Sequence, residues 1–558
     1  MVAMEHFVME HDAEGGPAQR PAQERRRTHP AERRAAIWIP GITLCLAAAI
    51  LRILVAAQRD GIEVDGITYL RNAQALWKSW GTLDVLHPPL YSIILAPIVG
   101  FSADPEWAAR LTSAVLGALW VWPTLWLARE TTDESVSWSA GLLVACFPAA
   151  VEASTRVLSE ATYGLCLIAF LAVLARTLNG TGFALAALSG TLGSLATLAR
   201  PEGMGYLLLA WGVLLAAPWG MPTRWTARRA ALAILAVTVA WVVTIAPYAV
   251  LVRQRTGHWH WSGKFGITLA WGESVGQEQP ALFIERFLAE LQRKEVPSSL
   301  FAYAAERPWA MARRLAFGLH DMDRSVAPAL LQTGGIVLLT LGLLRLRWRG
   351  APGPSEWFLP LALLPSGWVL LFLASPRYFT PVLPVIAIIA GIGLARLGRR
   401  DERVESMCRV SAAHIVLALA LLSFVPWIAR PWFRHDSAGV EKAAALWLRD
   451  AAGPGTVFVG RHPRVAFYAQ AREVSLAERP LEELLAEGRG AGARFLIVDN
   501  IHLPGLRPDL LPLVGGDPGR HSQDLTVAHI AEDRSGNRVV LYRIQPVGPA
   551  DRRGKNGT

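Results

Sequence analysis

The chain has 558 residues, a net charge of +10 and a mean hydropathy of +0.30, and 52% of its residues are hydrophobic. Only 18% of the residues are charged, against about 25% in soluble domains, so the composition excludes an ordinary soluble protein and favours a polytopic α-helical membrane protein. The basic residues gather in short loops between apolar runs, which is the pattern that orients a membrane protein, so we assign no nucleic-acid partner. The four cysteines form no CxxC pair and predict neither a disulfide nor a zinc site.

The first 35 residues are polar and rich in Pro, Gly and Arg, which predicts a disordered tail rather than a signal peptide. The basic stretch Arg25–Arg34 adjoins the first apolar run, so we expect this tail to stay in the cytoplasm. We expect a second disordered tail at residues 547–558.

About eleven apolar runs have the length of a membrane-spanning helix. They cover residues 36–57, 107–128, 136–152, 158–176, 182–199, 204–220, 230–251, 328–344, 356–374, 378–396 and 409–429. A further run, PLYSIILAPIVG at residues 89–100, is too short to span and follows two prolines, so we expect a re-entrant or interfacial helix there. The predicted transmembrane catalytic domain is residues 36–429.

The basic residues predict the direction of each crossing. If residues 89–100 do not cross, almost every basic cluster between spans falls on one side, as the positive-inside rule requires. The exception is the loop at 252–327, and long loops are exempt from the rule. We therefore predict a multi-pass protein of the cytoplasmic (inner) membrane, with external loops at 58–106 and 252–327 and an external C-terminal part.

The loop at 252–327 contains two amphipathic pieces, PALFIERFLAELQRK and PWAMARRLAFGL, which we expect to lie in the membrane interface. His258 and His260 stand close together in this loop. No carboxylate or cysteine accompanies them, so metal binding by this pair is a weak hypothesis.

Beyond about residue 430 the charge rises and the apolar runs shorten. EKAAALWLRD and LEELLAEGRG have helical patterns, whereas TVFVG, ARFLIVDN and NRVVLYRI have the pattern of buried strands. We predict a small external α/β domain at 430–546.

Polar residues of the predicted outer side are the candidates for chemistry. They are Asp65, His87, Glu160, Arg200, Glu202 and Arg377. Asp65 directly follows the first apolar run, where a carboxylate beside the lipid surface is suited to a lipid-borne substrate. The alternative is that Asp65 only caps a helix that begins near Gly66. Glu160 stands at the start of a span, where an ionisable group costs a few kcal/mol unless it faces a cavity.

Four motifs contain most of these residues. The first runs from Asp65 and Tyr69 to HPPLY at residues 87–91, the second is VLSEATY with Glu160, the third is LARPEG at 198–203, and the fourth is SPRYFTPVLP at 375–384. In order and sidedness they resemble the polyprenyl-phosphate-sugar glycosyltransferases of the GT-C superfamily. The resemblance is to the family 39-like group, which includes protein mannosyltransferases and the lipid A aminoarabinose transferase.

The resemblance implies roles for individual residues. Asp65 would be the base or would position the acceptor, and Glu160 would assist it or help to hold a divalent cation such as Mg or Mn. The residues expected to bind the donor phosphate are His87, Arg200, Arg377 and Tyr378. Those expected to contact substrate are Tyr69, Tyr91 and Glu202. Relatives often carry Asp-Glu at the first motif, whereas Gly66 follows Asp65 here, so we assign no cofactor, and a divalent cation held by Asp65 and Glu160 is the alternative.

The predicted function is transfer of a sugar from a polyprenyl-phosphate donor to a lipid, glycan or protein acceptor on the outer face of the membrane. Such transfer needs a base for the acceptor hydroxyl and cations for the leaving phosphate. One alternative is a lipid or glycan transporter or flippase, which should carry repeats and midplane charges. Another is a membrane-anchored envelope-assembly protein, which would leave Asp65 and Glu160 without a purpose.

Overall fold

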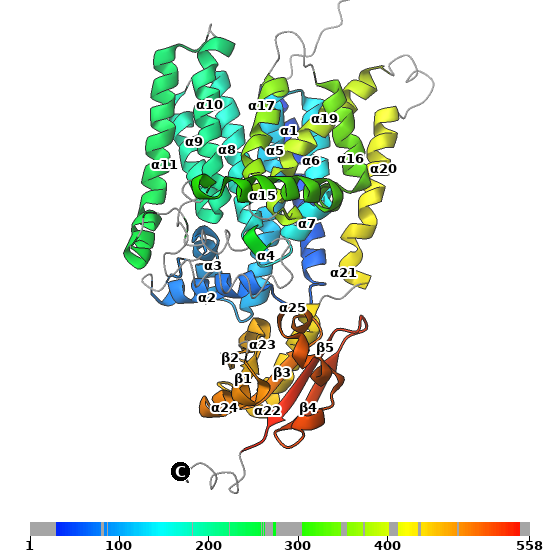
Figure 1. Cartoon of the computed structure of the whole chain (residues 1–558). Helices are drawn as coiled ribbons and strands as arrows, with labels where there is room; N and C mark the ends of the chain where they lie inside the picture. The colour runs from blue at the N-terminus through cyan, green and yellow to red at the C-terminus, as the bar shows by residue number, and fades with distance from the viewer. Residues whose placement is uncertain are drawn as a thin grey trace, which may run out of the picture.

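The structure is a computed structural model, in which a helical bundle stands on a small sheet domain (Figure 1). It describes residues 30–546 apart from 80–82, 86, 181, 222–223, 258, 260–261, 263–271, 275–303, 347–353, 372–373, 401–410, 434–436 and 477–478. Most of the predicted N-terminal tail, the predicted C-terminal tail, His258, His260 and the first amphipathic piece at 280–294 therefore lie outside the described residues.

The bundle is built from helices of very different lengths. They are α1 (Pro30–Ala56), α2 (Val64–Lys78), α3 (Leu90–Gly100), α4 (Pro105–Ala118), α5 (Val121–Thr131), α6 (Glu134–Cys146), α7 (Pro148–Ala153), α8 (Glu160–Gly180), α9 (Phe183–Ala199), α10 (Gly205–Gly220), α11 (Ala227–Thr256), α15 (Pro308–Asp321), α16 (Ala327–Arg345), α17 (Pro354–Leu363), α18 (Pro376–Phe379), α19 (Leu383–Arg400), α20 (Ala412–Ile428) and α21 (Arg430–Phe433). Short turns of other helical types are η2 (Pro201–Met204), η3 (Met322–Val326), η4 (Leu364–Leu371) and η5 (Thr380–Val382).

The polytopic helical fold is confirmed. In the described part of the chain, eight helical stretches are long and apolar enough to cross a membrane. The runs predicted at 136–152, 182–199 and 356–374 are instead shorter or interrupted helices, so the expected number of about eleven spans stays a prediction. The run at 89–100 is an 11-residue helix, α3, which is too short to span.

A buried arginine explains how the bundle tolerates one of these interruptions. Phe147 leaves the helical conformation before Pro148, as residues before proline tend to do. Pro148 has no N–H for the carbonyl of Val144. Arg52 of α1, which is wholly buried, donates to that carbonyl at 3.1 Å and to the carbonyl of Ala145 at 2.9 Å. A backbone break is acceptable inside a membrane where another group satisfies its carbonyls.

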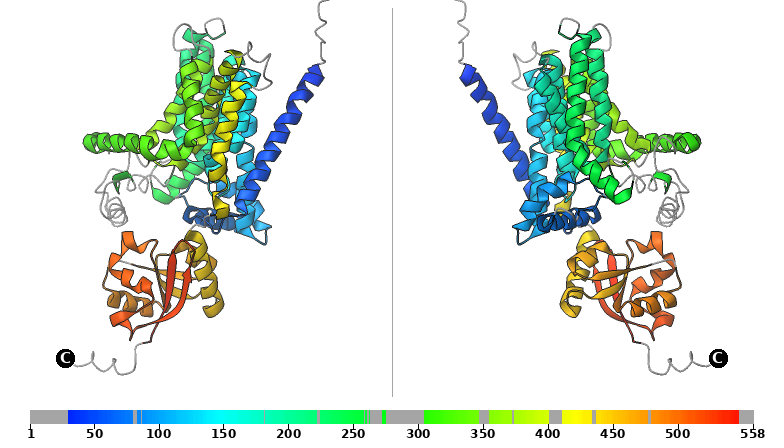
Figure 2. Two further views of the ribbon diagram at one scale, coloured as in Figure 1. Left: turned by 90° about the vertical axis from the view of Figure 1, so that its right-hand side faces the viewer. Right: turned by 90° about the vertical axis from the view of Figure 1, so that its left-hand side faces the viewer.

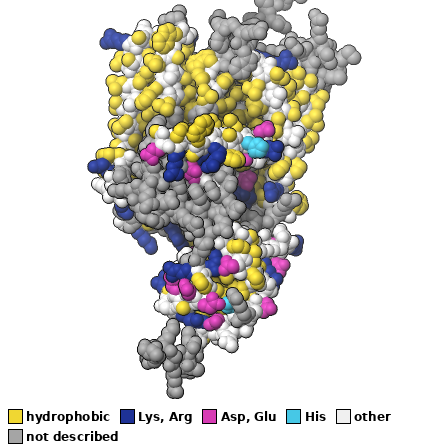
Figure 3. All heavy atoms as spheres, viewed as in Figure 1, with side chains coloured by type: hydrophobic (Ala, Val, Ile, Leu, Met, Phe, Trp, Pro, Cys, Tyr) yellow, Lys and Arg dark blue, Asp and Glu magenta, His cyan; other side chains and the backbone are white. Residues whose placement is uncertain are grey.

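Two amphipathic elements lie across the bundle axis. α2 runs perpendicular to the long helices at the end of the bundle that faces the sheet domain (Figure 2), and its buried residues recur at helical spacing from Gly66 to Leu76. α15 also runs across the bundle, and it is the second predicted interfacial piece. Figure 3 shows hydrophobic side chains covering the bundle above α15, whereas charged side chains gather along α15 and over the sheet domain.

The C-terminal part is a five-stranded sheet with helices on both faces. Its elements are α22 (Ser437–Ala452), β1 (Val457–Gly460), α23 (Pro463–Tyr468), β2 (Arg472–Ser475), α24 (Leu481–Gly490), β3 (Ala493–Asp499), α25 (Leu503–Leu506), η6 (Pro508–Gly515), η7 (Gly519–His521), β4 (Leu525–Glu532) and β5 (Arg538–Ile544). The strand order is β2-β1-β3-β5-β4, in which β1 pairs in parallel with β2 and β3, and β5 pairs antiparallel with β3 and β4.

The two helices and three strands predicted in this domain are confirmed as α22, α24, β1, β3 and β5. β2 and β4 were not predicted. Both are edge strands whose side chains are mostly exposed or half-buried, so neither produces an apolar run in the sequence.

The sheet domain is bonded to the loop that connects α1 with α2. The hydroxyl of Tyr468 accepts from the backbone N–H of Ile62 at 2.8 Å and donates to Glu106 at 2.9 Å. Arg464 donates to the carbonyl of Ile62 at 2.8 Å. Both polar groups of the Ile62 backbone are thus held by α23, three residues before Asp65.

Candidate active site

Asp65 belongs to the first turn of α2. The helix begins at Val64, and the residue in the capping position is Glu63, not Asp65. Asp65 therefore does not occupy the capping position, and the alternative that it caps this helix is wrong. The Asp65 carboxylate instead accepts an ion-paired hydrogen bond from Arg377, 312 residues away in sequence, at 2.8 Å.

Gly66 allows α2 to pack directly against the turn that precedes Glu160. A Cβ atom on Gly66 would lie 2.7 Å from the carbonyl oxygen of Val157 and 2.9 Å from the Ile62 side chain. Any larger residue would push the two segments apart. Gly66 therefore has a packing reason in this chain.

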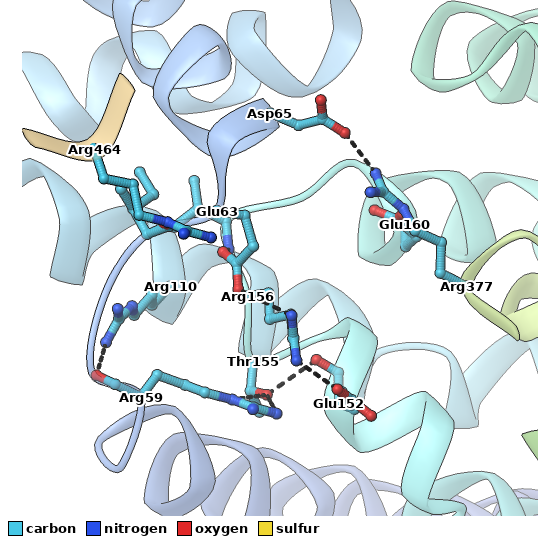
Figure 4. Close-up of polar contacts among 12 residues, drawn as sticks. Arg59, Glu63, Asp65, Arg110, Glu152, Thr155, Arg156, Glu160, Arg377 and Arg464 are labelled. Carbon is cyan, nitrogen blue, oxygen red and sulfur yellow. Dashed lines mark hydrogen bonds and ion pairs between the residues drawn. The ribbon is translucent and has the colours of Figure 1, made fainter. Parts of the chain in front are cut away.

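Glu63 ties the same two segments together, and we did not single it out from the sequence. Its Oε2 accepts from the N–H of Val157 at 3.3 Å, and its Oε1 lies 3.5 Å from Arg156 (Figure 4). Burial raises the pKa of Glu63, partly offset by the positive charge of Arg156. The sequence feature that could have identified Glu63 as part of the site is its position two residues before Asp65.

Arg377 bridges the two candidate acids. It lies in the short helix α18, and its Nε donates to Glu160 Oε1 at 2.5 Å while its Nη2 donates to Asp65 Oδ2 at 2.8 Å (Figure 4). A guanidinium presents donors in a rigid fork, so one side chain can hold two carboxylates in a fixed relation. α2, α8 and α18 meet at this point.

Arg200 forms a second cationic contact with Glu160. Its Nη1 donates to Glu160 Oε1 at 2.8 Å, and its Nη2 and Nε donate to the two oxygens of Glu202 at 2.9 and 3.3 Å. The ring of Tyr378 lies against both arginines, with its centroid 4.8 Å from the guanidinium carbon of Arg200 and 5.7 Å from that of Arg377. Cation–π contact of this kind stabilises the pair of like charges.

The two acids differ in their access to solvent. The side chain of Glu160 is 1% exposed, whereas that of Asp65 is 28% exposed and that of Arg377 is 36% exposed. Glu160 is therefore surrounded by protein and engaged by two arginines, and its other oxygen, Oε2, is buried with no hydrogen-bond partner among the residues that the structure describes. Asp65 and Arg377 are therefore the charged side chains of the cluster that are most exposed to solvent.

Three aromatic residues from the first motif pack behind Asp65. The Tyr69 ring contacts the rings of His87 and Tyr91 edge-on, with centroids 5.2 Å apart in each case. His87 is buried, and its Nε2 lies 3.7 Å from Asp65 Oδ1. Tyr69 donates to Ser159 at 3.0 Å, and burial raises its pKa, helped by the charge of Asp65.

Tyr91 lies one layer further in. It is wholly buried, and its hydroxyl is 2.6 Å from that of Ser113. All nine residues assigned from the sequence are thus gathered at one end of the bundle, although their assigned roles stay predictions.

A divalent cation does not fit this arrangement. The space between Asp65 and Glu160 is taken by the Arg377 guanidinium, and Arg200 adds a second positive charge on Glu160. Within the described ranges, the group of three metal-ligating side chains that the structure does contain is elsewhere, at His462, Asp499 and His502.

Comparison with known proteins gives a fold and no sequence family. No protein-family model matches the chain, and no curated protein sequence matches it. Among solved structures, ArnT from Cupriavidus metallidurans in the apo state matches with a TM-score of 0.55 at 15% identity, over 91% of this chain and 98% of that one. The same protein bound to undecaprenyl phosphate matches with a TM-score of 0.54 at 15% identity, over 90% and 98%.

An archaeal oligosaccharyltransferase is also similar. AglB from Archaeoglobus fulgidus, in complex with an inhibitory peptide and a dolichol-phosphate, matches with a TM-score of 0.53 at 12% identity, over 91% of this chain and 74% of that one. These neighbours have the GT-C architecture, and the chain is a multi-pass membrane protein with that fold.

Proposed function

We propose that this protein is a membrane glycosyltransferase that moves a sugar from a polyprenyl-phosphate donor to a hydroxyl acceptor on the outer face of the cytoplasmic membrane. The observation that carries the proposal is the bridge of Asp65, Arg377 and Glu160 at the end of a GT-C bundle. A partly exposed carboxylate beside a partly exposed guanidinium would suit a phosphate that is anchored in the lipid.

The neighbours in fold support the donor class. One ArnT structure holds undecaprenyl phosphate, and one AglB structure holds a dolichol-phosphate, both of which are polyprenyl phosphates. A donor of this kind keeps its tail in lipid, so its phosphate must be met at the edge of the bilayer. Asp65 and Arg377 lie on α2 and α18, at the end of the bundle where α2 runs across the axis.

Asp65 is the proposed base. It is partly exposed and stands in the first turn of a helix, where the free N–H groups favour a negative charge. A positioned base takes the proton of the acceptor hydroxyl as that oxygen attacks the anomeric carbon. Glu160 is too enclosed for this task, and its proposed role is to position Arg377 and Arg200.

The arginines are proposed to stabilise the leaving phosphate. As the bond between the anomeric carbon and the phosphate oxygen breaks, negative charge grows on the phosphate, and preorganised cations lower the energy of that state. Arg377 is half-exposed and directed by two acids, so it would meet the phosphate first. Arg200 is buried behind it and adds charge at longer range.

The distribution of basic residues supports the proposed orientation. α8 starts at the site with Glu160, and the long helices that follow it alternate in direction, apart from α15, which runs across the bundle (Figure 1). The basic residues at the far ends of the helices are Arg129, Arg176, Arg224, Arg228, Arg229, Arg345 and Arg396. A cytoplasmic location for that end satisfies the positive-inside rule and leaves the site and the sheet domain outside.

Intact-lipid and glycan mass spectrometry of a strain that lacks the protein tests the proposal. We expect one glycan or lipid to lose the mass of one sugar, while the polyprenyl-phosphate form of that sugar accumulates. The wild-type gene should restore the sugar and an Asp65→Asn gene should not. An unchanged lipid and glycan profile, or full restoration by Asp65→Asn, would contradict the proposal.

A further inference from the structure

A second group of chemistry-bearing side chains lies in the sheet domain. His462 follows the end of β1, Asp499 is the last residue of β3, and His502 comes three residues later. β1 and β3 are neighbouring parallel strands, so both chain segments leave the sheet at the same edge. In α/β sheets the edge at the carboxyl ends of parallel strands is where ligands are usually bound.

The three side chains converge on one point. His462 Nε2 lies 3.1 Å from Asp499 Oδ2, and His502 Nδ1 lies 3.1 Å from the same oxygen. The three ligand atoms all lie within 4.8 Å of one another. Bonds of about 2.0–2.1 Å to a tetrahedral zinc ion place ligand atoms about 3.4 Å apart, so small side-chain adjustments suffice for binding.

The loop that follows Asp499 orients the carboxylate of that residue. Asp499 Oδ1 accepts the backbone N–H groups of Ile501 and His502. Those bonds fix the plane of the carboxylate and turn Oδ2 toward the two imidazoles. Hydrogen bonds of this kind to metal ligands are a regular part of metal sites.

Burial also suits a bound ion. The side chains of His462 and Asp499 are 2% and 1% exposed, so they are fixed by the surrounding protein. His502 is 34% exposed and leaves a route from solvent. Two of the three candidate ligands are thus enclosed by protein, and the third is partly exposed to solvent.

We propose that His462, Asp499 and His502 bind one divalent transition-metal ion, for which zinc is the best fit, with water as the fourth ligand. Two imidazoles and a carboxylate are a typical ligand set for zinc, and three protein ligands leave one position open. This site is separate from the proposed transfer site, and nothing in the proposal depends on the transfer reaction.

The ion would fix the start of α23. His462 is the residue before this helix, and Arg464 and Tyr468 of α23 hold the backbone of Ile62. A metal that joins the ends of β1 and β3 would therefore hold the surface that contacts the loop leading to Asp65. Its role in this proposal is structural.

The test measures metal content and affinity of the full-length protein in detergent, stripped with a chelator and titrated with Zn(II). We expect one zinc ion per chain. Asp499→Asn and His502→Ala should each weaken zinc binding more than about 100-fold, because even the partners of metal ligands matter 10–100-fold. His521→Ala, which removes another histidine of the same domain, should bind zinc as the wild type does.

Two further measurements separate this site from others. Asp65→Asn and Glu160→Gln should keep the zinc, whereas loss of zinc in these variants would place the ion at the transfer site and overturn the proposal. X-ray absorption of the zinc-loaded wild type needs no variant and should show two imidazole ligands. Absence of stoichiometric zinc in the wild type, or a spectrum without imidazole, would mean that the three residues form only a hydrogen-bonded cluster.

Discussion

At the scale of single residues, the candidate site contains one partly exposed pair of charged side chains and one buried pair. Asp65 and Arg377 are partly exposed, while Glu160 and Arg200 are enclosed and joined to them through Glu160 Oε1. Breaking a buried ion pair leaves a charge without compensation, which costs far more than loss of a surface pair. Substitutions within the cluster should therefore differ in whether they change donor binding or stability, as well as in the size of the effect.

Arg377→Lys should raise the KM for the polyprenyl-phosphate donor by about 10–100-fold, since a hydrogen bond to a charged group contributes about 1.5–3 kcal/mol. Lysine keeps the charge but cannot donate to Asp65 and Glu160 through two separate nitrogens of a planar fork. Steady-state kinetics with the exposed control Arg324→Lys makes the comparison. An unchanged donor KM would show that Arg377 only anchors a helix end to lipid headgroups.

Glu160→Gln should destabilise the protein by about 3 kcal/mol, because two arginines then share a neutral partner in a buried site. Donor affinity should fall as well, since Arg377 loses one of the two acids that direct it. Thermal unfolding and donor KM would be measured beside Glu152→Gln, whose carboxylate is 55% exposed and pairs with Arg156. Equal stability of the two variants would speak against the positioning role.

At the scale of elements, the site depends on how closely α2 approaches the turn before α8. Gly66 makes that approach possible, and Glu63 bonds the two segments together. α23 holds the other end of the same loop at Ile62. The start of α2, which contains Asp65, is thus fixed by the bundle on one side and, through Ile62, by the sheet domain on the other.

Gly66→Ala should lower turnover while the protein still assembles in the membrane. The added methyl group would overlap the Val157 carbonyl, and relief of that overlap moves Asp65 away from Glu160. Overpacking of this kind costs about 1–3 kcal/mol. Gly212→Ala in α10 is the matched control, since a Cβ there meets nothing within 4 Å. Similar turnover in both variants would contradict the proposed role of Gly66 in the packing of α2.

At the scale of the whole molecule, the site and the sheet domain share one end of the bundle (Figure 1), and most of the basic helix ends lie at the other, apart from Arg253 and Arg255 in the last turn of α11. Reporter fusions that end at residues 349 and 460 should therefore report opposite sides of the membrane, with residue 349 in the cytoplasm. If both reporters were on the same side, the proposed orientation of the site would be wrong.

The sequence predicted much of this arrangement, for a physical reason. Asp65, Glu160 and Arg377 stand at helix ends, and counting crossings places such residues on one side of a membrane without knowledge of packing. The Arg377 bridge could not be predicted, because its partners are far apart in the chain. The same holds for Arg52, whose bonds depend on the break at Pro148. His462 and Asp499 meet only because β1 and β3 pair.

The central claim is that Asp65 acts as the base in sugar transfer, and turnover by purified Asp65→Asn tests it most directly. Asparagine keeps the size and hydrogen-bonding capacity of the side chain but cannot take the proton. With a purified polyprenyl-phosphate sugar and acceptor, we expect turnover to fall by about 10²–10⁴-fold, with unchanged thermal unfolding or a small shift. Near-normal turnover in a folded Asp65→Asn protein would contradict the claim.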